Sequence, residues 1–320
     1  MPTCTMLVNQ MSSKYNKKTI ESCKRIIREL GYIPNLVLTT KNPKLFLQDF
    51  KEKASKANNS DIVITYGGDG FFGLYQDFIH KHGQHTPLGH VPIGTTNDMI
   101  GNLGLSNDPI ENTRKILQGE IVERDIICSN DNAFGYISTF GTITNIPYDT
   151  PPILKKIGSA GYLIAALPDI IKVLKKQAPT YKIRYEQNGY THETECLIGA
   201  ISNAKGFGGV KIYPDAKQND SKFEVLLAKP EIIDKGLDIL HDFKEALILG
   251  ENPDIKLLEN YKNEIISFTT SELLLEFPHR HPKKHFDNDG DKGPKLKVGE
   301  PMYYEVYGKC KLLLPKNTRI

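Results

Sequence analysis

Residues 61–70 have the sequence Asp61-Ile62-Val63-Ile64-Thr65-Tyr66-Gly67-Gly68-Asp69-Gly70, in which a β-branched apolar run ends in three glycines and one carboxylate. The apolar run predicts a buried β-strand, and the glycines predict a sharp turn at its carboxyl end. Open α/β sheets bind their ligands at this end of the strands. Glycines there let backbone N–H groups approach anionic oxygens, and we expect a helix from Phe71 to about Ile79 to direct its N-terminus at a phosphate.

Asp69 is an acid within this predicted phosphate loop. A carboxylate beside phosphates is repelled unless it holds Mg²⁺ or accepts a proton from an attacking hydroxyl. Asp69 therefore indicates phosphoryl transfer rather than nucleotide binding alone. Taken by itself, Gly-Gly-Asp-Gly is equally well explained as a tight turn, because Gly and Asp favour turns for conformational reasons.

A second turn repeats the same design further along the chain. An apolar strand, a glycine, hydroxyls and an acid recur in Val91-Pro92-Ile93-Gly94-Thr95-Thr96-Asn97-Asp98. A helix between two such strands makes a βαβ crossover, whose two loops leave the sheet at the same edge. The two turns together favour a phosphate site over an isolated tight turn.

Two further motifs complete a set with a recognisable order. The set consists of Gly67-Gly68-Asp69-Gly70, Gly94-Thr95-Thr96-Asn97-Asp98, Ser202-Asn203 followed by Gly208-Gly209, and Asp289-Gly290-Asp291. In order and spacing it resembles the soluble bacterial diacylglycerol kinases and related lipid kinases. It is also similar to sphingosine kinases and, more distantly, to NAD kinases. The resemblance covers essentially the whole chain.

The resemblance implies a nucleotide site built from several loops. Its members here are Asn9, Ser12, Ser13, Thr40, Gly67, Gly68, Asp69, Gly70, Gly94, Thr95, Asn97 and Asp98. The family's first phosphate loop is Asn-Pro-x-Ser-Gly, of which this chain lacks the Pro and the Gly. For Thr40, the alternative to a nucleotide contact is a simple Ser/Thr turn. The chain also carries Phe71 in place of a family Thr that contacts phosphate, and Asn102 in place of an Arg.

The resemblance also assigns roles to two acids. Asp289 matches the Asp of the family's Asp-Gly-Glu motif, which implies that it is the general base acting on the acceptor hydroxyl. Asp69 then lies on the nucleotide or Mg²⁺ side of the reaction. In the sphingosine kinases the equivalent of Asp69 is proposed as the base, so the two assignments remain exchangeable.

A structural Mg²⁺ site is implied by a third match. The turn at residues 217–223 resembles the family's Asp-Gly-Leu turn, which holds the ion through one carboxylate and flanking backbone carbonyls. Carried over, the ligands are Asp220 and the backbone carbonyl oxygens of Lys217 and Lys222. Ser221 replaces the family glycine, so we expect a tighter turn or a less firmly held ion.

The composition sets broad limits on function. The chain has 320 residues, 39% hydrophobic and 25% charged, enough for a sizeable core and two domains. A formal charge of +3 gives no argument for nucleic acid but suits anionic nucleotides or an anionic membrane surface. Five scattered cysteines without a Cys-x-x-Cys pair predict reduced core residues in a cytoplasmic protein. Because no apolar run approaches about 20 residues, we expect any membrane contact to be peripheral, at the inner face of the cell membrane.

The pattern of elements changes near Glu120. Strand–helix alternation precedes it and predicts a Rossmann-like α/β domain. Strand-like runs follow, at residues 121–128, 134–140, 181–185, 194–202, 223–228, 265–269, 273–277 and 303–314. They predict an antiparallel β-sandwich, interrupted by a basic amphipathic helical insertion at residues 152–176. We place the nucleotide-binding domain at residues 1–122 and the β-sandwich domain at residues 123–302. The family resemblance implies that about residues 303–320 return to the nucleotide-binding domain. We expect the site to lie in the cleft between the two domains.

The function expected from these features is ATP- and Mg²⁺-dependent phosphorylation of a lipid hydroxyl, with diacylglycerol converted to phosphatidic acid. The alternatives are a sphingosine-like or isoprenoid alcohol acceptor, and a degenerate homologue that binds nucleotide or lipid without catalysis. NAD kinases share Gly-Gly-Asp-Gly but pair it with Asn-Glu, whereas this chain has Asn97-Asp98. The expected partners are ATP and a membrane lipid, with no nucleic acid, and a homodimer is compatible with the sequence.

Overall fold

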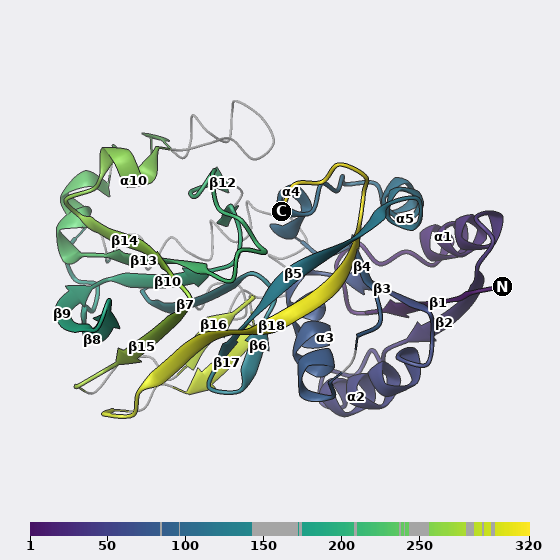
Figure 1. Cartoon of the computed structure of the whole chain (residues 1–320), viewed down its shortest axis with the longest axis horizontal. Helices are drawn as coiled ribbons and strands as arrows, with labels where there is room; N and C mark the ends of the chain where they lie inside the picture. Colours follow the sequence, from purple (N-terminus) through teal and green to yellow (C-terminus); the bar gives the residue numbers. More distant parts are fainter. Residues whose placement is uncertain are drawn as a thin grey trace. The chain divides into compact units, whose positions relative to one another are not determined.

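The chain forms two compact units in a computed structural model (Figure 1). The structure describes residues 1–83, 85–95, 97–142, 172, 175–207, 210–236, 238–239, 241–242, 256–279, 285–289, 291–295 and 298–320. Unit 1 comprises Met1–Ile126 and Lys309–Ile320, and unit 2 comprises Ile127–Gly308. The expected helical insertion at residues 152–176 lies mostly outside the described residues.

Unit 1 is built on a parallel sheet. Its first four strands are β1 (Thr3–Val8), β2 (Ile33–Leu38), β3 (Ile62–Gly67) and β4 (Leu88–Pro92). They lie in the order β2-β1-β3-β4, and the end of β18 (Met302–Leu314) adds to β4 in parallel through Leu312 and Leu88. Strand β3 is therefore an inner strand, which explains why residues 63–67 are all buried.

Helices cover both faces of this sheet (Figure 1). They are α1 (Lys17–Glu29), α2 (Phe46–Ala57), α3 (Asp69–Lys81), α4 (Met99–Asn102) and α5 (Pro109–Leu117). Helices α1 and α5 lie together on one face, and α2 and α3 lie on the other. The Asn16 side chain caps α1 and the Asp108 side chain caps α5, each accepting backbone N–H bonds from the first turn.

The strand order positions a ligand site. β1 leads into α1 on one face, whereas its neighbour β3 leads into α3 on the other face. The loops after these two strands therefore diverge, and the carboxyl edge between them is the topological switch point at which α/β sheets bind ligands. The backbone N–H of Asn9, just after β1, donates to the carbonyl oxygen of Tyr66 in β3 at 2.9 Å.

Unit 2 consists mainly of antiparallel strands. The strands are β6 (Asn132–Phe134), β7 (Ile137–Gly141), β8 (Tyr181–Gln187), β9 (Tyr190–Cys196), β10 (Ile198–Ser202), β11 (Gly206–Phe207), β12 (Val210–Lys211), β13 (Phe223–Ala228), β14 (Ile265–Thr270), β15 (Glu272–Glu276), β16 (His285–Asn288) and β17 (Asp291–Lys295). One sheet has the order β14-β13-β10-β7-β16-β17. In the other set of strands, β15 pairs with β18, β8 pairs with β15, and β9 pairs with β8. Short helices are η1 (Pro230–Lys235) and α10 (Leu257–Asn260), and β5 (Glu120–Ser129) contributes residues to both units.

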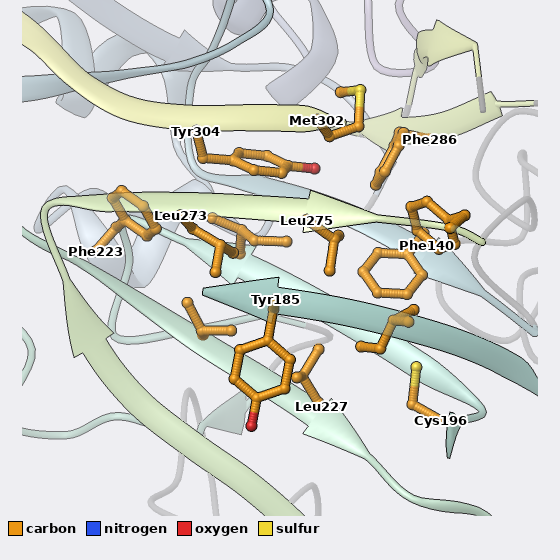
Figure 2. Close-up of a cluster of buried hydrophobic side chains, with 14 of the residues drawn as sticks. Phe140, Tyr185, Cys196, Phe223, Leu227, Leu273, Leu275, Phe286, Met302 and Tyr304 are labelled. Atoms are coloured by element: carbon orange, nitrogen blue, oxygen red, sulfur yellow. The ribbon is translucent and has the colours of Figure 1, made fainter. Parts of the chain in front are cut away.

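The core of unit 2 is aromatic and combines side chains from both sets of strands (Figure 2). Phe140 of β7 makes edge-to-face contacts with Phe277 and Phe286, with ring centroids 5.1 Å and 5.5 Å away. Tyr304 of β18 also packs on Phe286 at 6.2 Å. Such pairs stabilise a core by about 0.5–1.5 kcal/mol each beyond the area that they bury.

Two expectations about the whole chain can be compared with the structure. All five cysteines are free and buried, as the sequence predicted. Within the described residues, no helix combines the length and the apolar character required to cross a bilayer.

His90 in β4 is a buried histidine with one unused nitrogen. Its Nδ1 lies 3.0 Å from the hydroxyl oxygen of Thr65, and its ring packs on Phe72 with centroids 4.7 Å apart. Its Nε2 has no hydrogen-bond partner among the described residues. Burial lowers the pKa of His90 from 6.5 to about 3, so the folded protein holds the ring neutral.

We expect His90 to make the protein less stable in acid. Above pH 6.5 the ring is neutral in both states, whereas below it the unfolded chain takes up a proton that the folded chain excludes until about pH 3. Stability is therefore lost as the pH falls, by about 2 kcal/mol at about pH 5. His90→Phe should reduce the fall in melting temperature between about pH 7.5 and pH 5, and His192→Phe, which changes an exposed ring, should not. Equal pH dependence in all three proteins would exclude His90 as the cause.

Candidate functional site

The two glycine turns of unit 1 are in direct contact. The N–H of Ile93 donates to the carbonyl oxygen of Gly67 at 2.7 Å. A Cβ atom placed on Gly94 would lie only 2.5 Å from the Cα of Gly68. The backbones therefore approach more closely than any residue with a side chain at position 94 would allow. The structure thus brings together the two turns that the sequence placed at one edge.

Asp69 links these turns. It is 8% exposed and is the first residue of α3, directly after Gly68, which is the N-cap of this helix. Its Oδ2 accepts a hydrogen bond from the N–H of Asp98 at 2.7 Å, and its Oδ1 accepts one from the N–H of Met99 at 3.3 Å. Backbone N–H groups stabilise an ionised carboxylate, so Asp69 holds the start of α4 against the start of α3.

Asp69→Asn should weaken this link. An amide offers one acceptor oxygen and turns an NH₂ group toward a backbone N–H, so at least one hydrogen bond is lost and a donor is left unsatisfied. We expect the melting temperature to fall by the equivalent of about 1–3 kcal/mol and ATP affinity, measured by calorimetry, to fall at least about tenfold. Asp77→Asn on the same helix breaks a partly exposed ion pair with Lys81 and should change stability by less than about 1 kcal/mol. Identical behaviour of the two variants would contradict this role.

Asn97 closes the second turn. Its backbone has φ 55°, a left-handed conformation that Asn adopts more readily than most residues. Its Oδ1 accepts a bond from the N–H of Gly94 at 2.8 Å, and its Nδ2 donates to the Gly94 carbonyl oxygen at 3.1 Å. Asn102, at the position where the family has Arg, donates to the carbonyl oxygen of Asp98 at 3.2 Å. Thr96 of this motif lies outside the described residues.

The loop after β1 joins the same cluster. The hydroxyl of Thr95 donates to the hydroxyl oxygen of Ser13 at 3.0 Å, and the N–H of Lys14 donates to the carbonyl oxygen of Ile93 at 3.1 Å. The Asn9 side chain accepts a bond from the N–H of Met11 at 2.9 Å. Ser12 is half-buried in this loop. The predicted phosphate residues of three loops therefore lie together at the switch point of unit 1.

Thr40 occupies the loop after β2. Its hydroxyl oxygen accepts a bond from the N–H of Asn42 at 3.1 Å, as the Ser/Thr turn alternative required. The Asn42 side chain accepts a bond from the N–H of Lys44 at 3.1 Å, and α2 begins four residues after Asn42, at Phe46. The nearby Lys41 ammonium lies 5.9 Å from the centre of the Tyr15 ring, a contact between the loops after β1 and β2 that we did not predict.

Phe71 has a packing role in the first turn. A Cβ atom on Gly67 would lie 2.5 Å from the Phe71 ring, so the ring fills the space that this glycine leaves open. Phe71 also packs on Phe46 and Phe50, with centroids 6.2 Å and 5.6 Å away. The family hydroxyl at this position is thus replaced by a buried aromatic contact between α3 and α2.

Asp289 lies in unit 2 and is almost completely buried, at 5% exposed. Its Oδ1 accepts bonds from the N–H groups of Tyr136 and Ile137 at 2.8 Å and 3.0 Å, and its Oδ2 accepts one from Gly135. Its own N–H donates to the carbonyl oxygen of Ile137 at 2.9 Å, and its φ is 55°. The predicted general base therefore also fixes the bend between β6 and β7.

The predicted cation turn precedes β13 in unit 2. Asp220 and Lys222 are exposed, and the Asp220 Oδ1 accepts a bond from the N–H of Lys222 at 3.1 Å. Ser221 has φ 61°, the left-handed conformation for which the family uses glycine. In the described part of the chain, no three His, Cys, Asp or Glu side chains are grouped to hold a metal. A cation at this turn would depend on backbone carbonyls, such as that of Lys217, as well as on carboxylates.

Glu224 is an acid near this turn that the sequence analysis missed. It is 6% exposed, and its Oε2 has no hydrogen-bond partner among the described residues. Burial, and then the negative charge of Asp220, raise the pKa of Glu224 to about 8. Its place on a strand with apolar neighbours on both sides, Phe223 and Val225, was the available signal, because an acid in such a run needs a partner.

The part of the chain that carries the loops of unit 1 is similar in sequence to known proteins. Residues 3–129 match the family described as the diacylglycerol kinase catalytic domain. Diacylglycerol kinases of Staphylococcus aureus strains JH9 and Newman are 29% identical over 175 residues, which cover 53% of this chain and 53% of each relative. The matched part thus spans about half the length of these curated relatives.

The fold agrees with this assignment over nearly the full chain. The crystal structure of a diacylglycerol kinase from Bacillus anthracis superposes with a TM-score of 0.72 and 17% sequence identity. It covers 98% of this chain and 97% of that one. At this identity the likeness concerns the fold, a mixed α/β architecture, and the sequence match concerns the N-terminal part. The chain is thus similar in sequence to bacterial diacylglycerol kinases over its N-terminal part, and similar in fold to one of them over nearly its full length.

Proposed function

We propose that this protein is an ATP- and Mg²⁺-dependent lipid kinase that transfers the γ-phosphate of ATP to a lipid hydroxyl, with diacylglycerol as the acceptor. The observation that carries the proposal is the contact of two glycine turns, linked by Asp69, at the switch point of a parallel sheet. Such an edge suits a polyphosphate, because glycines expose backbone N–H groups and leave room for oxygen atoms. The relatives named above support the choice of a lipid acceptor.

The chain's own residues would divide the work of binding. Gly67, Gly68 and Gly70 would face the phosphates from one turn, and Gly94, Thr95 and Asn97 from the other. Hydroxyls of Ser12 and Ser13 and the Asn9 side chain would complete the cradle, with Thr40 beside it. When bound, Mg²⁺ would neutralise charge on the transferred group. In this proposal, Asp69 and Asp98 are the carboxylates closest to the Mg²⁺ ion.

The proposed general base is Asp289. It would accept the proton of the lipid hydroxyl as that oxygen attacks phosphorus, while ADP leaves with the electron pair of the broken bond. Its three backbone hydrogen bonds fix the direction of the carboxylate, which a base requires, although they also compete for its lone pairs. Asp69 remains the second candidate for the base, and its oxygens are likewise engaged by N–H groups.

A second function has a specific observation in its favour. Phe71 is buried against Gly67 and offers no hydroxyl, and Asn102 offers no positive charge, so the family's phosphate-contacting hydroxyl and its arginine are both absent. A homologue that binds nucleotide or lipid without transferring phosphate would tolerate both changes. A third possibility within the same enzyme class is another lipid alcohol, such as sphingosine or an isoprenoid alcohol.

Radiolabelled ATP distinguishes these functions. The purified full chain would be incubated with Mg²⁺, labelled ATP and mixed micelles containing diacylglycerol, sphingosine or an isoprenoid alcohol, and with NAD in a separate reaction. We expect label in phosphatidic acid, and none when Mg²⁺ is chelated. ATP binding by calorimetry without transfer to any acceptor would support the non-catalytic function, and transfer to NAD alone would overturn the lipid-kinase proposal.

A further inference from the structure

We propose that Ser202 is a positioning residue for the general base, which it holds through the peptide group between Tyr136 and Ile137. This role rests on the proposed function and on the assignment of the base to Asp289. The Ser202-Asn203 motif, to which the family resemblance gave no role, thereby acquires one. Ser202 would touch neither ATP nor lipid, and it would act on the rate of phosphoryl transfer rather than on binding.

The carbonyl oxygen of Tyr136 is the first contact. It accepts two hydrogen bonds from the end of β10, one from the hydroxyl of Ser202 at 3.1 Å and one from the N–H of Asn203 at 2.9 Å. The same hydroxyl lies 3.5 Å from the carbonyl oxygen of Ala204, which is a longer and weaker alternative. A carbonyl oxygen has two lone pairs, so these two donors tie the oxygen firmly to β10.

The other end of this peptide group meets Asp289. The peptide bond between Tyr136 and Ile137 is trans, so its planar group directs the carbonyl oxygen and the N–H in opposite directions. The oxygen accepts from Ser202, and the N–H donates to the Oδ1 of Asp289 at 3.0 Å. One rigid peptide group therefore connects the Ser202 hydroxyl with the proposed base.

Asp289 depends on this connection for its direction. β16 pairs with β7 through Asp287 and Asn288, and Asp289 is the next residue, with φ 55°. Its carboxylate is held by the N–H groups of residues 135–137. A turn residue just beyond the paired part of a strand moves more readily than a residue within it. A movement of the bend at residues 135–137 would therefore carry the carboxylate with it.

Ser202 itself has a rigid support. It is fully buried and is the last residue of β10, a strand that is paired on both sides. Ile137 of β7 lies opposite Ser202 on one side, and Glu224 of β13 lies opposite it on the other. Inner strands of a sheet open less readily than turns. The hydroxyl thus gives the bend a fixed point of attachment, as a residue that supports a catalytic group must.

Variants that differ by one buried hydroxyl test this role. Ser202→Ala deletes the hydroxyl, and Ser202→Thr retains it. Thr142→Val is the matched control, because the Thr142 hydroxyl is also buried in unit 2 and donates to a backbone carbonyl oxygen, that of Pro179, at the same distance of 3.1 Å. The full chain of each variant is assayed with Mg²⁺, labelled ATP and diacylglycerol micelles, and its melting temperature is recorded.

We expect Ser202→Ala to lower the single-turnover rate at saturating ATP about tenfold, because a small displacement of a catalytic group is costly. The affinity for ATP and the KM for the lipid should change by less than about twofold, since the proposed role involves neither ligand. Ser202→Thr should recover most of the rate. Thr142→Val should keep the rate while it loses about as much thermal stability as Ser202→Ala.

Hydrogen exchange gives a readout that does not depend on catalysis. Without the Ser202 hydroxyl, the amides of residues 135–137 should exchange about fivefold faster, because one of the two bonds that tie this bend to β10 is lost. Mass spectrometry of a peptide that covers residues 132–141 measures this exchange. Thr142→Val should leave it unchanged.

The outcomes separate this role from the proposed function. Unchanged exchange at residues 135–137 in Ser202→Ala would overturn the proposal, whatever the activity of the variant. An equal loss of rate in Ser202→Thr and Ser202→Ala would also overturn it if Ser202→Thr melts with wild type, because the hydroxyl is then not the cause. A loss of rate shared by Thr142→Val would indicate general destabilisation instead. If wild type transfers phosphate to no acceptor, the proposed function is wrong, and the exchange data alone decide whether Ser202 holds the bend.

Discussion

Gly94→Ala should cost the protein most of its activity and part of its stability. The added Cβ would lie 2.5 Å from the Cα of Gly68 and 2.7 Å from the Oδ1 of Asn97, and the first of these is a backbone atom that cannot rotate away. Relief requires the two turns to separate, which breaks the bonds that Ile93 and Asp69 make across them. Overpacking of this kind costs about 1–3 kcal/mol, and a shift of about 1 Å in a catalytic loop lowers turnover about a hundredfold.

A graded series of glycine variants tests this reasoning. On Gly68 the same Cβ would lie 3.4 Å from the Cα of Gly94, so Gly68→Ala should have a smaller effect. On Gly308 it would meet nothing within 4 Å, and Gly308→Ala serves as the matched control. Melting temperature and phosphoryl transfer should follow the order Gly308, Gly68, Gly94, from least to most affected. An inverted order would show that the contact of the turns does not limit activity.

Local pattern was sufficient for the architecture of unit 1. A β-branched run followed by glycines specifies a buried strand and a tight turn through short-range effects alone, and residues 62–67 form β3 as expected. Likewise, Asp108 and Pro109 begin α5 because a side-chain cap and a first-turn proline act within a few residues. The approach of two such turns also followed, since a βαβ crossover fixes where its loops emerge.

Long-range partners explain what the sequence did not reveal. Residues 134–140 were predicted as one strand, but the chain bends at Gly135 and Tyr136 because Asp289, far along the sequence, binds their N–H groups. Residues 194–202 were also predicted as one strand. They form β9 and β10 in different sheets, and between them the N–H of Leu197 donates to Ala228.

The site shows the same division between local and distant effects. Asn97 could be named from its own motif, because its left-handed conformation is a local requirement, and the glycines could be named because each follows an apolar strand in the sequence. The partner of Asp69 could not, because the N–H groups of Asp98 and Met99 come from another loop and carry no side-chain signature. Glu224 was overlooked because its apolar neighbours are a weak signal, and the fold is needed to show that its side of β13 is also buried.

Asp289→Asn should lower turnover at least about a hundredfold while leaving ATP affinity nearly unchanged, if Asp289 is the base. Asn keeps the size of the side chain and tolerates the φ of 55°, so the backbone need not move. The structure adds a second effect. One amide oxygen cannot replace two carboxylate oxygens as acceptors for Gly135, Tyr136 and Ile137, so we also expect a loss of about 1–3 kcal/mol in stability.

These two effects separate when rate and stability are measured on the same samples. Asp131→Asn is the matched control, because Asp131 is exposed, has φ 65° and belongs to the same unit. Single-turnover rates at saturating ATP, taken well below the melting temperature, report chemistry rather than folding. A stable but inactive Asp289→Asn protein would assign the base to Asp289. If this variant melts earlier yet turns over normally while Asp69→Asn is inactive at saturating ATP, Asp289 is a structural anchor for residues 135–137 and the base is Asp69.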